Sequence, residues 1–171
     1  MQLLPRYTSR VATRRTESGS VETLGLTEPR LAAWRAFLNA HATLIDVLER
    51  ELAAAECLPL SSYDVLLALA EAPDRRRRMH ELASAVVLSR SGLTRLVDRL
   101  EAEGLLRREA CPTDRRGAFA VLTADGLAAL RRAWPIYARG IAEHFARHLD
   151  DAEARTLTEA LERVRAAAPT A

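Results

Sequence analysis

The stretch that decides the fold is residues 88–108, which read LSRSGLTRLVDRLEAEGLLRR. Its apolar side chains recur at the i, i+3, i+4 and i+7 spacing of an amphipathic helix with one buried face. They are Leu93, Leu96, Val97 and Leu100. Ser89 suits the N-terminal cap and Gly104 the C-terminal cap, so we expect a short helix over 89–103.

Two shorter helices are expected before this one. Ser61 or Ser62 would cap the first, which ends before Pro73. The second runs from about Met79 to Val87. After residue 104, extended runs at 105–109 and 118–122 flank a polar loop, which predicts a β-hairpin. Short helices joined by a tight turn and followed by a basic hairpin outline a winged helix-turn-helix.

Long helical patterns flank this region on both sides. A heptad-type seam begins after Pro29 and comprises Leu31, Trp34, Leu38, His41, Ile45, Leu48 and Leu52. A second comprises Leu127, Leu130, Trp134, Tyr137, Ile141, Phe145 and Leu149, with a kink expected at Pro135. Asp150 or Asp151 would cap a last helix carrying Leu157, Leu161 and Val164. These faces exceed what one small module can bury, which indicates pairing between two copies.

The fold class we predict is mainly α, with a small β-hairpin wing and long N- and C-terminal dimerisation helices. Residues 1–28 form a flexible arm, and residues 29–58 form the N-terminal dimerisation helix. The winged helix-turn-helix occupies residues 59–122, and the C-terminal dimerisation helices occupy 123–171. An alternative role for the arm is to reach DNA through its arginines, Arg6, Arg10, Arg14 and Arg15.

Positive charge is concentrated in one segment, although the formal net charge is only +2. Residues 31–74 carry two arginines against seven acidic residues. Residues 75–116 carry eleven arginines against six acidic residues. A local basic surface on an acidic body is typical of phosphate contact.

The sequence disfavours several other classes of protein. No apolar run is long enough to span a membrane, and no secretory signal is visible, so we expect a cytoplasmic protein. The two cysteines make no disulfide framework, and neither zinc spacing nor a phosphate loop is present. The four histidines have no partnered nucleophile. We therefore expect no enzyme activity, no metal and no cofactor.

The expected helix over 89–103 presents polar side chains suited to DNA. Arg90 with Thr94, and Ser91 with Arg95, are spaced i, i+4 and project together near its N-terminal half. Arginine can bond bidentately to guanine in the major groove, and serine or threonine can contact bases or phosphates. At the hairpin tip, residues 114–117 (DRRG) offer a guanidinium for the minor groove beside a carboxylate that could hold it.

The run at 88–108, together with residues 114–117 (DRRG) and 122–126 (LTADG), resembles the MarR family over about residues 30–166. The resemblance implies a homodimer built from the terminal helices that binds a pseudo-palindromic operator. By motif position, Asp114 and Arg116 match the wing pair whose arginine enters the minor groove. Ser89, Arg90, Ser91, Thr94 and Arg95 match the recognition segment, without assigning bases or phosphates to any of them.

We therefore expect a repressor whose operator affinity falls when a small ligand binds, with helix 89–103 in the major groove and wing 109–118 in the minor groove. The expected DNA-binding residues are Ser89, Arg90, Ser91, Thr94, Arg95, Arg99, Asp114, Arg115 and Arg116. A small aromatic or phenolic effector would bind a pocket lined by Trp34, His41, Tyr63 and Trp134.

Several alternatives stay open at this stage. Arg75–Arg78 is either a solvated turn or a phosphate clamp, and Arg99 contacts phosphate or pairs with a neighbouring acid. Redox sensing would need a reactive thiol at Cys57, expected to be buried, or at Cys111, expected in the wing loop. A ligand-independent architectural DNA binder is a further alternative to a repressor.

Overall fold

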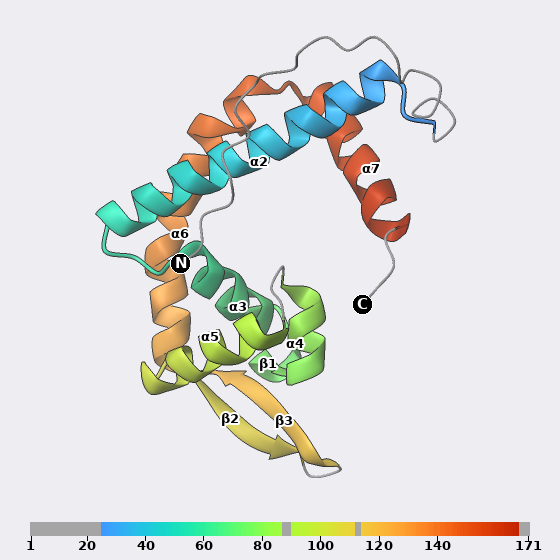
Figure 1. The fold of residues 1–171 in the computed structure, drawn as a ribbon. Coiled ribbons are helices and arrows are strands. Elements are labelled where there is room, and N and C mark those ends of the chain that lie inside the picture. Colours follow the sequence, from blue (N-terminus) through green and yellow to red (C-terminus); the bar gives the residue numbers. More distant parts are fainter. Residues whose placement is uncertain (1–24, 87–89, 112–113, 168–171) are drawn as a thin grey trace. The chain divides into compact units, whose positions relative to one another are not determined.

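The computed structural model describes residues 25–86, 90–111 and 114–167 (Figure 1). Its helices are α2 (Glu28–Ala54), α3 (Leu60–Ala70), α4 (Met79–Ala85), α5 (Arg90–Ala102), α6 (Ala124–His144) and α7 (Asp151–Ala167). Its strands are β1 (Arg76–Arg78), β2 (Leu106–Cys111) and β3 (Asp114–Leu122). Short 3-10 turns lie at Pro73–Arg75 and Ala146–His148. The predicted mainly α fold with a small β wing is confirmed.

The chain divides into two compact units, residues 1–41 and 42–171, and α2 crosses their boundary. In the described part of the first unit, apolar side chains are exposed, with Trp34 at 56% and Phe37 at 42%. The Phe37 ring lies 6.2 Å from both the Trp34 and the His41 rings. Phe37 thus joins Trp34 and His41 of the predicted seam into an aromatic strip along this part of α2.

The core of the second unit gathers side chains from α3, α5, the sheet and α6. The four apolar residues that predicted α5 are all buried, at no more than 8% exposed. At about 25 cal/mol per Å² of apolar surface, each such leucine or valine contributes roughly 1.5–3 kcal/mol. Gly104 follows α5 with φ at 73°, a conformation that only glycine adopts at low cost, so its predicted capping role is confirmed.

Helix α3 begins differently from the prediction. Pro59 is its N-terminal cap, and the Glu49 carboxylate accepts a hydrogen bond from the Leu60 amide at 3.1 Å. The expectation that Ser61 or Ser62 caps this helix is wrong, because both lie inside its first turn. Ser62 is instead buried at 1% exposed, and its hydroxyl accepts a hydrogen bond from Arg99.

The sheet has three antiparallel strands in the order β1-β3-β2, not the two of the predicted hairpin. The third strand is β1, so the last three residues of the arginine run form a strand and not the solvated turn that was one of its two alternatives. Its middle residue, Arg77, donates from Nε to the Ala68 carbonyl at 2.7 Å. The backbone groups of β1 are satisfied by pairing with Phe119–Val121 of β3. A run of arginines does not by itself predict such a strand.

Helices α6 and α7 begin at side-chain caps. The Thr123 hydroxyl accepts from the Gly126 amide, and Asp150 accepts from the Ala152 and Glu153 amides. Asp150 is thus the cap for which the sequence left two candidates. Helix α6 contains Pro135 and ends at His144, so the predicted seam to residue 149 continues beyond the helix.

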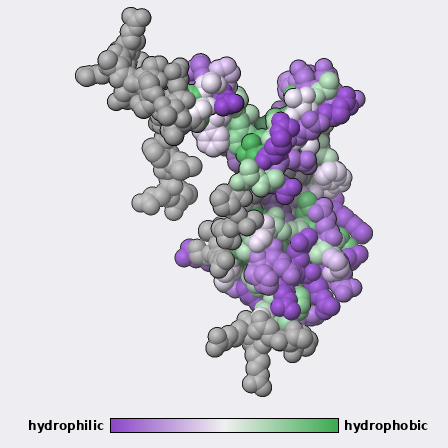
Figure 2. All heavy atoms as spheres, turned by 90° about the vertical axis from the view of Figure 1, so that its right-hand side faces the viewer, coloured by the Kyte–Doolittle hydropathy of each residue, from purple (hydrophilic) through white to green (hydrophobic). Residues whose placement is uncertain are grey.

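Apolar side chains remain exposed on these helices as well. In the second unit they include Trp134, Phe145, Leu161 and Val164. On the face shown in Figure 2, hydrophilic residues cover most of the surface and apolar residues show between them. No helix within the described ranges has the length and apolar character needed to cross a membrane.

We predict that Gly126→Ala destabilises the protein by about 2–3 kcal/mol. A Cβ at this position would lie 2.0 Å from the Leu105 carbonyl oxygen, which is backbone and cannot rotate away. Gly104→Ala is the matched control, because a Cβ there meets nothing within 4 Å and strains only the φ angle, at about 1 kcal/mol. Urea unfolding would measure both, and equal losses would contradict the packing argument.

Candidate nucleic-acid interface

Helix α5 divides its surface between the core and solvent. Thr94, Arg95 and Asp98 are exposed on the side away from the buried apolar row. Arg90 and Ser91 open the helix as predicted, and the side chains are described from Gly92 onward. Ser89 lies outside the described residues. A helix with one face in the core and polar side chains on the other can present those side chains to a groove.

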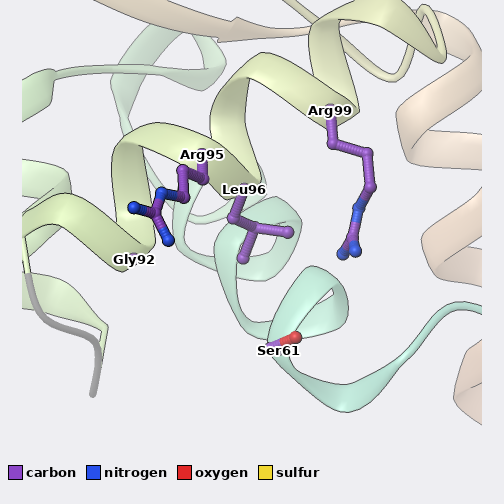
Figure 3. Close-up of a pocket in the computed structure, with 5 residues that line it drawn as sticks. All are labelled: Ser61, Gly92, Arg95, Leu96 and Arg99. Carbon is purple, nitrogen blue, oxygen red and sulfur yellow. The ribbon is translucent and has the colours of Figure 1, made fainter. Parts of the chain in front are cut away.

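A hollow of about 240 Å³ lies between α5 and the start of α3 (Figure 3). It is lined by Ser61, Gly92, Arg95, Leu96 and Arg99. Figure 3 shows the Arg95 and Arg99 side chains on either side of Leu96, with Ser61 on the neighbouring helix. Two guanidinium groups and a hydroxyl around one hollow offer hydrogen-bond donors and positive charge to an anion such as a phosphate.

Arg99 is partly engaged within the protein. Its Nη2 donates to the Ser62 hydroxyl at 3.1 Å, and its Nε lies 3.9 Å from Glu103. Its side chain remains 52% exposed, so it stays available to solvent while α3 positions it. Glu103 is thus the neighbouring acidic residue with which Arg99 pairs.

The base of the wing is tied to α5 through Arg108, a residue that the site prediction missed. From β2, its Nη2 donates to Asp98 and its Nη1 to Glu101, both at 2.6 Å. Glu101 also accepts from the Arg108 amide at 2.8 Å. Partial burial lowers the pKa of Arg108, but the hydrogen bonds to Asp98 and Glu101 outweigh it and raise that pKa. The guanidinium therefore stays charged and fixes β2 against α5.

The wing is formed by β2 and β3, which pair from Leu106↔Leu122 to Cys111↔Asp114. The predicted tip residues Asp114, Arg115 and Arg116 all belong to β3. The ladder shifts register between Ala110 and Cys111, an irregularity that locally twists a strand pair.

The two cysteines differ in exposure. Cys111 is the last residue of β2 and is 5% exposed, so the expectation that it lies in the loop is wrong. Cys57 was expected to be buried and is half-buried, with its Sγ 3.5 Å from the Ala55 carbonyl oxygen. Low exposure at Cys111 disfavours the redox alternative there.

Tyr63 and Trp134, two of the residues predicted to line an effector pocket, belong to one aromatic group. The Tyr137 ring lies 4.9 Å from Tyr63 and 6.5 Å from Trp134, edge-on to each. Burial raises the pKa of both tyrosines, so both phenols are neutral at ordinary pH. Tyr137 was not among the predicted residues, although it shares the apolar spacing of Trp134. Trp34 and His41 lie on the N-terminal part of α2.

No group of three or more potential metal ligands occurs among the described residues. The candidate interface on α5 and the start of α3 carries arginines and hydroxyls, with carboxylates beside them. Such groups can bind an anion through charge-assisted hydrogen bonds.

A sequence profile of the MarR family matches residues 58–117. The HTH-type transcriptional regulator MhqR of Bacillus subtilis (strain 168) is 36% identical over 86 residues, covering 50% of this chain and 59% of MhqR. The transcriptional regulator HosA of Escherichia coli O111:H- is 38% identical over 74 residues, covering 43% of this chain and 53% of HosA. The chain spans about half the length of the curated relatives it matches.

Solved structures match over more of the chain. Sco3205 of Streptomyces coelicolor, a MarR family transcriptional regulator solved in complex with DNA, is 37% identical with a TM-score of 0.78. The match covers 85% of this chain and 92% of Sco3205. AbsC, a second MarR family regulator from that organism, is 36% identical with a TM-score of 0.75, covering 82% of this chain and 94% of AbsC.

We predict that Arg108→Met lowers the free energy of unfolding, mainly because its interaction with Glu101 is lost. A double-mutant cycle with Glu101→Gln should give a coupling energy of about 1–2 kcal/mol, because both side chains are half-buried. The cycle with Asp98→Asn should give less than about 1 kcal/mol, because Asp98 is 58% exposed. Arg107→Met, on the adjacent exposed position, is the matched control; a control loss as large as that of Arg108→Met would contradict this clamp.

Proposed function

The chain belongs to the MarR family of DNA-binding transcriptional regulators, and we propose that it is a homodimeric repressor that leaves its operator when a small ligand binds. The observation that carries the proposal is the divided surface of α5. Its apolar row is buried, while Thr94 and Arg95 are exposed beside it. In this reading α5 enters the major groove with these side chains toward the base edges.

The wing would bind next to the recognition helix. Arg116 enters the minor groove and Asp114 holds its guanidinium, while Arg115 is a further DNA-binding residue. Support comes from their place in β3, which the Arg108 clamp ties to α5 through β2. A rigid link of this kind would fix the distance between the two grooves that one protomer reads.

A second copy of the chain would cover the terminal helices. Exposed large apolar side chains occur on α2, α6 and α7, at 56% for Trp34, 53% for Trp134 and 67% for Val164. Such side chains are usually covered in the functional assembly when they are contiguous. Residues 29–58 and 123–171 are accordingly proposed as the dimerisation elements. A two-fold dimer would place two recognition helices roughly 34–36 Å apart, one turn of a pseudo-palindromic operator.

The effector we propose is a small aromatic or phenolic molecule. The Trp134 ring supports it, because it is 53% exposed beside Tyr137 and offers a face on which an aromatic molecule can stack. A ligand shifts the operator equilibrium only if it binds the DNA-competent and released dimers unequally.

The first test is binding to the DNA upstream of the protein's own gene. We expect selective binding there, and Arg95→Ala should reduce the preference over scrambled DNA by about tenfold to a hundredfold. Arg116→Ala should also weaken binding, whereas Arg50→Ala, an exposed arginine on α2, should not. Fluorescence anisotropy at fixed salt would measure each affinity.

Three results would contradict this assignment. Wild type without preference over scrambled DNA at physiological salt would indicate an architectural binder. Wild-type affinity in both Arg95→Ala and Arg116→Ala would refute the placement of α5 and the wing. A mass near 18.9 kDa in sedimentation equilibrium would refute the dimer.

The second test concerns the effector. Adding phenolic ligands should quench tryptophan fluorescence and lower operator affinity over the same concentration range, because both follow from one binding event. Trp134→Phe should lose most of the quenching, since Trp134 lies in the aromatic group and only two tryptophans are present. No quenching and no change in affinity across a broad panel would contradict a phenolic effector.

A further inference from the structure

The two faces of the three-stranded sheet carry different chemistry. Residues paired across antiparallel strands share a face, and neighbours along a strand alternate. On the face toward the helices, Ala120 lies between Arg77 and Arg108, and both arginines bond to helices. This face belongs to the core.

The opposite, outer face is built of two cross-strand rows. One row is Arg76, Val121 and Arg107, and the other is Arg78, Phe119 and Glu109. Three arginines thus stand on this face against one carboxylate of the sheet. Arg76 and Arg107 are 45% and 57% exposed, so their charges face solvent.

The arginine stems are packed, although their charged ends are exposed. The Arg76 and Arg78 guanidinium carbons lie 5.2 and 5.5 Å from the centre of the Phe119 ring. Val121 is only 7% exposed although it lies on the outer face, where Arg76 and Arg107 are its cross-strand neighbours. Their alkyl stems account for that burial. Side chains held in this way lose less conformational entropy when they bind an anion.

The acidic neighbours do not cancel this charge. Arg76 lies 3.4 Å from Asp74, and Arg107 is paired with Glu109. Asp74 is 76% exposed, and Glu109 is half-buried at 33% but pairs with an Arg107 side chain that is 57% exposed. Ion pairs with such an exposed member contribute up to about 1 kcal/mol. A phosphate can replace such a partner at small cost.

The position of the outer face determines which part of the DNA it could contact. Helix α5 is clamped to the sheet through Arg108 on the inner face, so the outer face points away from the groove that α5 would occupy. Strand β3 runs along the hairpin (Figure 1) to Phe119 and Val121, the central residues of this face. The outer face is thus joined through β3 to the proposed wing contact and lies apart from the proposed contact of α5.

We propose that Arg76 and Arg107, supported by Phe119 and Val121, form a second contact surface for backbone phosphates flanking the operator. This inference rests on the proposed function and adds sequence-independent affinity to it. Each neutralised phosphate contributes about 0.9 to the slope of log affinity against log salt, and a dimer presents the surface twice.

The test compares the double variant Arg76→Gln, Arg107→Gln with wild type on two operator duplexes. Glutamine keeps most of each stem and removes the charge. One duplex ends just outside the wing contacts, and the other extends by about one helical turn on each side. On the long duplex we expect an affinity loss of at least about tenfold near 0.1 M salt and a slope shallower by about 3–4 units. On the short duplex the variant and wild type should differ by less than about twofold.

The matched control is Arg50→Gln, which also removes an arginine charge paired with an exposed acid, Asp46. It should bind both duplexes like wild type. Equal affinity and slope for the double variant and wild type on the long duplex would overturn this inference while leaving the proposed function intact. Equal losses on both duplexes would overturn the flanking contact as well. Wild type without operator preference would overturn the proposed function and this inference with it.

Discussion

The clamp of Arg108 by Asp98 and Glu101 is the contact on which α5 and the wing, the two proposed DNA-binding elements, depend. Neither a 13-residue helix nor a two-stranded hairpin is stable by itself in water, so each must be held by tertiary contacts. The clamp joins one to the other with charge-assisted hydrogen bonds at 2.6 Å, beside the buried apolar row of α5. Because both elements share one anchor, a shift of α5 would carry the wing with it.

Two carboxylates on α2 link that helix to α3 and α6, and α3 in turn contacts α5. Glu49 holds the first amide of α3, and Glu51 hydrogen-bonds His144 of α6 at 2.6 Å. Gly140 permits the approach, since a Cβ there would lie 2.5 Å from Leu48. A movement of α6 would thus reach α3, and through Ser62 and Arg99 would reach α5. This is a physical route by which an event near the aromatic group could alter the DNA-directed face.

Periodicity predicted the elements whose sequence pattern is local, namely α5 with Gly104, the long helices and the two wing strands. It missed β1, because three arginines show no alternation and their partner strand lies about forty residues later. It also assigned the α3 cap to a nearby serine, whereas the actual acceptor, Glu49, comes from another helix. For the interface, residue type indicated Arg95 and Arg99, but Arg108 could not be separated from Arg107 until strand pairing gave them opposite faces.

Strand β1 lies at the edge of the sheet, and edges are where a strand of another molecule can add itself. Its three arginines would oppose the same three arginines of a second copy if two sheets met edge to edge. Like charges directly opposite one another destabilise such a pairing. The arginine strand thus protects the protein against aggregation through its sheet, so removing its charges would affect the behaviour of concentrated protein even without DNA.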